Sequence, residues 1–218
     1  MKTRREIITI LSRLLLFLPV VLTTGLTFVG RVFAKIKKRI LSEDTDPQSL
    51  VNLNPAHLDT RHMPIMPVEA FGTMGDKDAP YNPDRWRLTC TGAVQTPVEL
   101  SYPEIMKLPV IEREVLLLCP GVFVNHGRWK GISGKALIRL VQPHDSVSRI
   151  IFYGRSRFED RTDKYELNEF SSDAVFLAYA VNGQALPRKH GFPLRVVAEG
   201  HYGMNWTKFV YKIEFSGN

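Results

Sequence analysis

The sequence predicts an α+β domain with mixed sheets and short helices, preceded by an apolar N-terminal helix. Three observations support this prediction. Short runs rich in β-branched and aromatic residues outnumber the helical patterns after residue 85. The helical patterns, which follow Ser101 and Ser133, are both short. Residues 14–30 carry no charge over 17 positions, which is the short end of the roughly 17–25 needed to span a bilayer.

Residues 1–40 form a basic segment around the apolar stretch, with nine Lys or Arg against Glu6. Thr3-Arg4-Arg5-Glu6-Ile7-Ile8 resembles a twin-arginine export signal. The cationic cluster at 31–39 instead predicts, by the positive-inside rule, that the following chain stays cytoplasmic. We expect a retained helix that anchors an exported domain to the membrane, and a cleaved signal that leaves a soluble periplasmic protein is the alternative.

The net charge of +7 lies entirely in this segment. The other residues carry twenty Lys or Arg and twenty-one Asp or Glu. A basic groove for a phosphate backbone is therefore not expected, and nucleic acid is excluded as a partner.

Residues 41–84 are predicted to be a linker and an extended arm, because six prolines between 42 and 84 disfavour helix. Residues 85–218 are predicted to form the folded domain. Ser101 begins a short helix that ends near residue 107, and Ser133 caps a helix at 135–141. Asn182-Gly183 predicts a hairpin turn. The predicted strands are 85–94, 112–118, 150–153, 175–181, 194–198 and 207–215.

The two cysteines, Cys90 and Cys119, have different surroundings in the sequence. Cys90 lies within a strand, on the inward face. Cys119 ends an apolar strand just before Pro120-Gly121, where chains commonly present functional side chains. From the residues alone, Cys119 is either a functional thiol, an inert buried thiol or the disulfide partner of Cys90.

The six histidines show no zinc-site spacing. His126 follows Cys119 by seven residues, which permits a Cys–His pair without further support for a hydrolase. Arg195 and Lys208 flank a glycine-containing turn, where two cations and backbone N–H groups are suited to hold a phosphate. A structural arginine and a solvated lysine are the alternative.

Taken together, these segments resemble the molybdopterin-binding domain of the sulfite oxidase family. The resemblance covers about residues 60–218 and keeps the family's order. It rests on WRLTCTG at 86–92, LSYPEIMKLP at 100–109, Leu118-Cys119, WKG at 129–131, YAVNG at 179–183, HGFPLR at 190–195 and the stretch from Tyr202 to Lys208.

The resemblance implies a sulfite-oxidase-type fold and a molybdenum-molybdopterin cofactor. Cys119 matches the family's metal-ligand and catalytic cysteine, and a soft thiolate suits this metal. Arg195 and Lys208 match positions that bind the phosphate of the pterin. The remaining cofactor-binding residues that it implies are His190, Gly203, Trp206 and Thr207.

The implied activity is two-electron oxygen-atom transfer. A membrane segment and export most resemble the bacterial catalytic subunits of protein-methionine-sulfoxide reductase. The implied substrate is then an S-oxide, and the implied partner is a haem-containing membrane electron-transfer subunit. Eukaryotic-type sulfite oxidases carry an Arg-rich stretch after the cysteine, where this chain has a single Arg128. Sulfite oxidation is therefore the alternative activity.

We predict that Asn125, His126 and Arg128 form the rim that meets the substrate. A third possibility, from another class, is a cofactor-free binding module that is anchored to the membrane and held by a Cys90–Cys119 disulfide.

Overall fold

The structure is a computed structural model that describes residues 37–157 and 159–217. The predicted N-terminal membrane or signal helix lies outside these residues. Within them, no helix combines the length and the hydropathy that crossing a bilayer requires.

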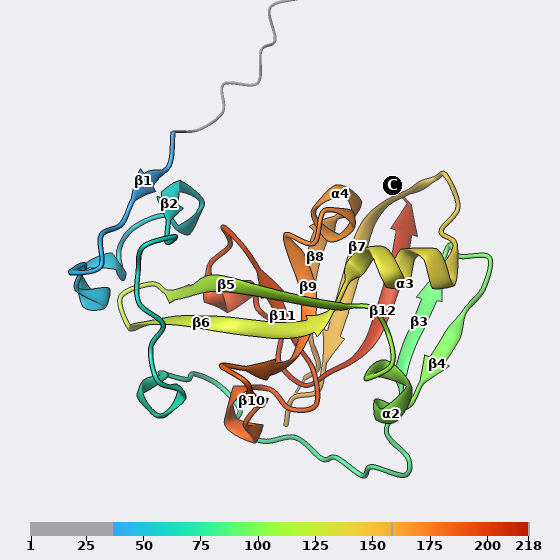
Figure 1. Ribbon diagram of the computed structural model, residues 1–218. Helices are drawn as coiled ribbons and strands as arrows, with labels where there is room; N and C mark the ends of the chain where they lie inside the picture. The colour runs from blue at the N-terminus through green and yellow to red at the C-terminus, as the bar shows by residue number, and fades with distance from the viewer. Residues whose placement is uncertain (1–36, 158, 218) are drawn as a thin grey trace, which may run out of the picture. The chain divides into compact units, whose positions relative to one another are not determined.

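Two five-stranded sheets contain most of the strand residues of the described chain (Figure 1). The first has the order β10-β9-β6-β5, with β11 also paired to β9, and all of its pairs are antiparallel. Its strands are β5 (Val110–Cys119), β6 (Phe123–Ile132), β9 (Val175–Val181), β10 (Gln184–Ala185) and β11 (Arg195–Ala198).

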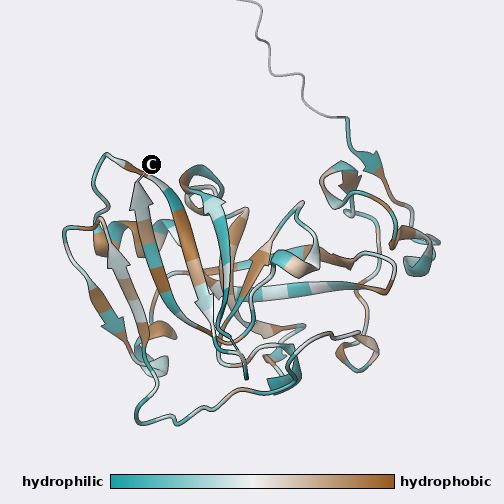
Figure 2. Cartoon of the chain, turned by 180° about the vertical axis from the view of Figure 1, so that it is seen from behind, coloured by the Kyte–Doolittle hydropathy of each residue, from teal (hydrophilic) through white to brown (hydrophobic). Residues whose placement is uncertain are grey.

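The second sheet has the order β4-β3-β12-β7-β8 and is mixed, because β3 and β12 are parallel and its other pairs are antiparallel. Its strands are β3 (Leu88–Gly92), β4 (Val98–Leu100), β7 (Val147–Gly154), β8 (Arg161–Glu166) and β12 (Val210–Gly217). Figure 2 shows hydrophilic and hydrophobic residues following one another along the strands, as expected where one face of a sheet is buried. The main core contains buried residues of both sheets.

Three short helices accompany the sheets: α2 (Tyr102–Ile105), α3 (Gly134–Val141) and α4 (Leu167–Ser171). The predicted cap of α2 is confirmed, since Ser101 and Glu104 form a capping box. Ser133 stands at the N-cap of α3 as predicted, but its side chain does not accept a hydrogen bond from the helix. The Ser133 hydroxyl bonds to Asp173, and the Asp173 carboxylate accepts the Gly134 N–H at 2.7 Å. A carboxylate distant in sequence thus replaces the serine.

The predicted turn at Asn182-Gly183 is also confirmed. Both residues have positive φ, 49° and 79°, as a two-residue turn of a β-hairpin requires, and they join β9 to β10. The strand β6 was not predicted, because the segment after Cys119 reads as a loop. The loop is only residues 120–122, since Cys119 pairs with Phe123 across a hairpin.

The arm packs on the domain and belongs to the same compact unit as the rest of residues 38–218. It contains the parallel strands β1 (Arg39–Ile40) and β2 (Leu58–Asp59). Prolines begin two of its short 3₁₀ helices, where their missing N–H costs nothing. Its 3₁₀ helices are Pro47–Leu50, Pro55–His57 and Val68–Ala70.

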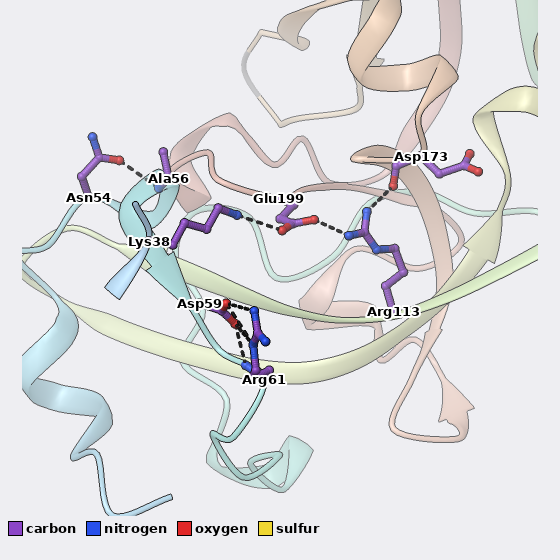
Figure 3. A network of polar contacts seen from close by, with 8 residues as sticks. All are labelled: Lys38, Asn54, Ala56, Asp59, Arg61, Arg113, Asp173 and Glu199. Atoms are coloured by element: carbon purple, nitrogen blue, oxygen red, sulfur yellow. Dashed lines mark hydrogen bonds and ion pairs between the residues drawn. The ribbon is translucent and has the colours of Figure 1, made fainter. Parts of the chain in front are cut away.

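A second hydrophobic cluster forms where the arm meets the outer face of the β5–β6 hairpin. Leu50 and Leu58 of the arm pack there with Leu116, Leu118 and Val124. An ion-pair network also joins arm and domain (Figure 3): Glu199 lies between Lys38, at 3.2 Å, and Arg113. Because the arm covers one face of the hairpin, functional side chains of β5 and β6 are presented on the other.

Candidate active site

Cys119 is the last residue of β5 and lines a cavity of about 250 Å³. Its side chain is a free thiol, as is that of Cys90, so the structure contradicts the alternative of a Cys90–Cys119 disulfide. Burial raises the pKa of the Cys119 thiol. Leu117, two residues earlier on the strand, lines the same cavity, whereas Leu116 and Leu118 pack under the arm. Strand alternation therefore directs the cysteine inward.

Arg195 lies in β11 and is 4% exposed, at the wall of this cavity. Its guanidinium donates to main-chain carbonyls, at 3.0 Å to His190 and 3.4 Å to Trp206. It also lies over the rings of Trp129 and Trp206. No carboxylate pairs with it in the described part of the chain. Burial lowers the pKa of Arg195 to about 9, which reflects a cation without a counter-charge.

Lys208 precedes β12 and lines the same cavity. Its ammonium donates to main-chain carbonyls, including that of Met74 at 2.9 Å and that of Asp76. Burial, and then the nearby Arg195, lowers the Lys208 pKa to about 8. A buried arginine and a half-buried lysine thus meet at one wall, where an anionic ligand would relieve both the desolvation of these cations and their repulsion.

His190 ends a 3₁₀ helix (Arg188–His190) and is 1% exposed. Its Nε2 atom has no hydrogen-bond partner among the described residues. Burial lowers the pKa of His190 to about 4, so the imidazole is neutral at pH 7. A buried polar atom without a partner is costly in a native fold, and here it lies beside the cavity. A ligand with a hydrogen-bonding edge would satisfy it.

The turn at 201–208 supplies another part of the wall, including the 3₁₀ helix Gly203–Asn205. Side chains of β8 and α4 hold this turn from behind: Tyr165 donates to the Asn205 carbonyl, and Glu169 bonds to His201 at 2.6 Å. The Thr207 hydroxyl donates to Asp163. Thr207 therefore lines the cavity as predicted, but its hydroxyl proton is engaged by a carboxylate.

The structure brings together all seven residues predicted to bind the metal or cofactor. Each of them lines the one cavity: Cys119, His190, Arg195, Gly203, Trp206, Thr207 and Lys208. They come from separate segments of the chain, and the cavity wall draws on strands of both sheets.

The predicted substrate rim requires correction. Asn125 lines the cavity, but both ends of its amide bond to the backbone of Gly72, at 2.8 and 2.9 Å. His126 points to the opposite face of β6, where its Nδ1 lies 3.0 Å from the Pro64 carbonyl under the arm. Arg128 pairs with Glu114 at 2.7 Å, also away from the cavity. Adjacent residues of a strand cannot share one face.

Sequence reasoning missed the apolar and backbone parts of the wall. Met74, Val122 and Met204 line the cavity and are exposed by 56%, 47% and 59%. Residues 72–76 of the arm form a continuous stretch of the wall. No spacing in the sequence marks these residues, because they reach the cavity only through the path of the arm and the 201–208 turn.

A model of the oxidoreductase molybdopterin-binding domain family matches residues 76–218. The chain belongs to this family. It is therefore an oxidoreductase, and its cofactor is molybdenum-molybdopterin. The residues present fit such a cofactor. A free buried thiol, a buried guanidinium without a carboxylate partner, a half-buried ammonium and an imidazole nitrogen without a partner among the described residues all line one cavity. In this family member, every residue that was predicted to bind the cofactor lines that cavity.

Curated relatives of this molybdopterin-binding chain include protein-methionine-sulfoxide reductase catalytic subunits. That of Campylobacter jejuni is 25% identical over 150 residues, covering 62% of this chain and 50% of the relative. That of Gluconobacter oxydans is 26% identical over 210 residues, covering 87% of this chain and 66% of the relative. The chain thus spans about half to two thirds of the length of these relatives.

An uncharacterized oxidoreductase of Bacillus subtilis is 27% identical over 150 residues, covering 67% of this chain and 74% of the relative. Among solved structures, the sulfane dehydrogenase SoxCD of Paracoccus pantotrophus has the same fold, with a TM-score of 0.60 and 18% identity. The match covers 84% of this chain and 51% of that chain.

Proposed function

We propose that this molybdopterin oxidoreductase reduces an S-oxide such as methionine sulfoxide to the thioether. The net reaction breaks the sulfur–oxygen bond, consumes two electrons and two protons, and releases water. When bound, the cofactor supplies this two-electron oxygen-atom chemistry, and the protein binds, orients and shields the reactants.

The observation that carries the choice of a neutral substrate is the uncharged hairpin tip around Cys119. The charged residues of the cavity lining come from other segments, and they are Asp76, Arg155, Arg161, Arg195 and Lys208. Residues 117–125, which form the tip of the hairpin, contain no charged side chain. Three of the six large hydrophobic side chains that are exposed in the described residues lie at this cavity. An anion such as sulfite is best gathered by cations, whereas a sulfoxide carried on an apolar stem gains from apolar contact.

Each predicted site residue takes a role in this proposal. The Cys119 thiolate would be the protein ligand of molybdenum, which requires a lower pKa once the metal binds. Arg195 and Lys208 would hold the phosphate of the pterin. His190 would offer its free Nε2 to the pterin, and Gly203 and Trp206 would form the adjoining wall. Asp163 would keep Thr207, and with it Lys208, in position.

The electrons would come from a haem-containing membrane subunit, as the resemblance to the reductase branch implies. Residues 1–40 would anchor the chain to the membrane, with the domain outside the cytoplasm. Fractionation of cells that produce the full chain tests both points. The domain should sediment with membranes and be digested by protease added to spheroplasts. A soluble cytoplasmic protein would contradict this part of the proposal.

Steady-state assays of the purified holoenzyme test the reaction. We expect turnover of methionine sulfoxide with a reduced viologen dye, and a much lower rate with sulfite and an electron acceptor. Faster sulfite oxidation than sulfoxide reduction would overturn the proposal in favour of the alternative activity.

A further inference from the structure

Residues 72–76, which we call the strap, cross the cavity wall as one continuous stretch. The strap belongs to the arm, and its last residue, Asp76, is the first residue that the family model matches. It is held at both ends and in the middle by side chains of the domain. The contacts at these three points indicate the function of the strap.

Asn125 holds the first end of the strap from β6. The amide oxygen accepts the Gly72 N–H at 2.8 Å, and the amide nitrogen donates to the Gly72 carbonyl at 2.9 Å. Asn125 is 1% exposed, and these two bonds use both ends of its amide. A side chain at position 72 would overlap the Phe123 ring, so only glycine permits this close approach.

Ser156 holds the other end, just beyond β7 in the second sheet. Its hydroxyl donates to the Asp76 carboxylate at 2.7 Å, and the Arg157 N–H donates to the same oxygen at 3.1 Å. These two bonds lower the pKa of Asp76, so the carboxylate is ionised when it accepts them. The strap therefore connects the two sheets beside the cavity.

Lys208 ties the middle of the strap. Its ammonium donates to the Met74 and Asp76 carbonyls and lies 3.4 Å from the Thr73 hydroxyl. The cation that would meet the anionic tail of the cofactor is thus also bonded to the strap. The position of the strap and the contents of the cavity are coupled through one side chain.

We propose that the strap is the wall that retains the cofactor, and that Asn125 and Ser156 are positioning residues that hold its ends. The inference rests on the cofactor lying in this cavity, as in the proposed function. It assigns no substrate and does not depend on the direction of the reaction. Opening of the strap at either end would let the cofactor leave without unfolding the domain.

The test measures loss of the cofactor from purified holoenzyme. Wild-type protein, Ser156→Ala and Ser156→Thr are dialysed against cofactor-free buffer, and bound molybdenum is followed by elemental analysis. Ser156→Ala should lose metal about ten- to hundredfold faster, as expected when one hydrogen bond to a charged group is removed. Ser156→Thr keeps the hydroxyl and should stay within about twofold of wild type.

Ser171→Ala is the matched control. The Ser171 hydroxyl donates to the Asn168 carbonyl on α4, outside the cavity, and its loss should leave metal retention unchanged. Asn125→Ala should also speed the loss of molybdenum. If that variant does not fold, the comparison of Ser156→Ala with Ser156→Thr tests the inference. Equal melting temperatures of cofactor-free wild type and Ser156→Ala separate strap opening from general destabilisation.

Metal retention in Ser156→Ala within twofold of wild type would overturn the inference, as would an equal acceleration in Ser171→Ala. A different result would contradict the proposed function. An enzyme that retains molybdenum but does not reduce methionine sulfoxide contradicts the function and leaves the strap assignment standing.

Discussion

Arg195 lies close enough to Lys208 that its positive charge lowers the pKa of the lysine, and both side chains line the same cavity. Buried like charges repel one another, and the described residues offer Arg195 no carboxylate. Binding of an anion between these two side chains would stabilise both positive charges. Two of the following predictions depend on it.

Removal of the Arg195 charge should weaken phosphate binding. We expect glycerol phosphate to raise the melting temperature of cofactor-free wild-type protein. Arg195→Gln should reduce the affinity for this ligand about ten- to hundredfold, as expected for a charge-assisted hydrogen bond. Arg149→Gln removes an exposed arginine that pairs with Glu166 and should have no effect. Calorimetric titration measures the affinities, and equal affinity in Arg195→Gln and wild type would refute the prediction.

The same binding should depend on pH through Lys208. Its pKa of about 8 in the cofactor-free protein means that the ammonium is lost as the pH rises past that value. Phosphate monoesters remain dianions there, since their second pKa is about 6. Affinity for glycerol phosphate should therefore start to fall near pH 7.5, and in Lys208→Gln the fall should begin only as the pH approaches the Arg195 pKa of about 9. An identical pH profile in the two proteins would contradict the assignment.

Loss of the Cys119 sulfur should release the metal. Cys119→Ser removes the sulfur ligand that the proposal gives to molybdenum, so we expect less bound metal and no activity. The variant should still fold, because the side chain ends a strand at a cavity. Cys90→Ala, in the core of the other sheet, should keep its molybdenum. Full metal occupancy in Cys119→Ser, measured by elemental analysis, would rule out the ligand role.

A charge on the apolar rim should impair turnover of a neutral substrate. Val122→Asp places a carboxylate at a position that is 47% exposed and lines the cavity. We expect a severalfold rise in KM for methionine sulfoxide with metal content unchanged. Val110→Asp is the control, since Val110 is 50% exposed on the same hairpin but outside the cavity. Equal KM values for the two variants would argue against contact between the rim and the substrate.

Much of the fold follows from local patterns. The turn at Asn182-Gly183 and the cap at Ser101 depend on neighbouring residues alone, so they were predicted correctly. The hydrogen-bond acceptor at the cap of α3 was not, because Asp173 reaches it from a distant segment. The strand β6 was missed because Asn125, His126 and Arg128 interrupt its apolar pattern. Those polar residues bond to the arm and to β5, which a local pattern does not reveal.

The sequence alone, through its resemblance to the sulfite oxidase family, predicted the chemistry of this chain. Cys119, Arg195 and Lys208 were assigned because a thiol and two cations, in that order along the family's motifs, suit a metal and a phosphate. Only the tertiary structure decided which polar residues share the cavity. Side chains alternate along β6, so Asn125 faces inward and His126 faces the arm. Strand pairing and the path of the arm set that alternation, and both depend on contacts between residues far apart in the chain.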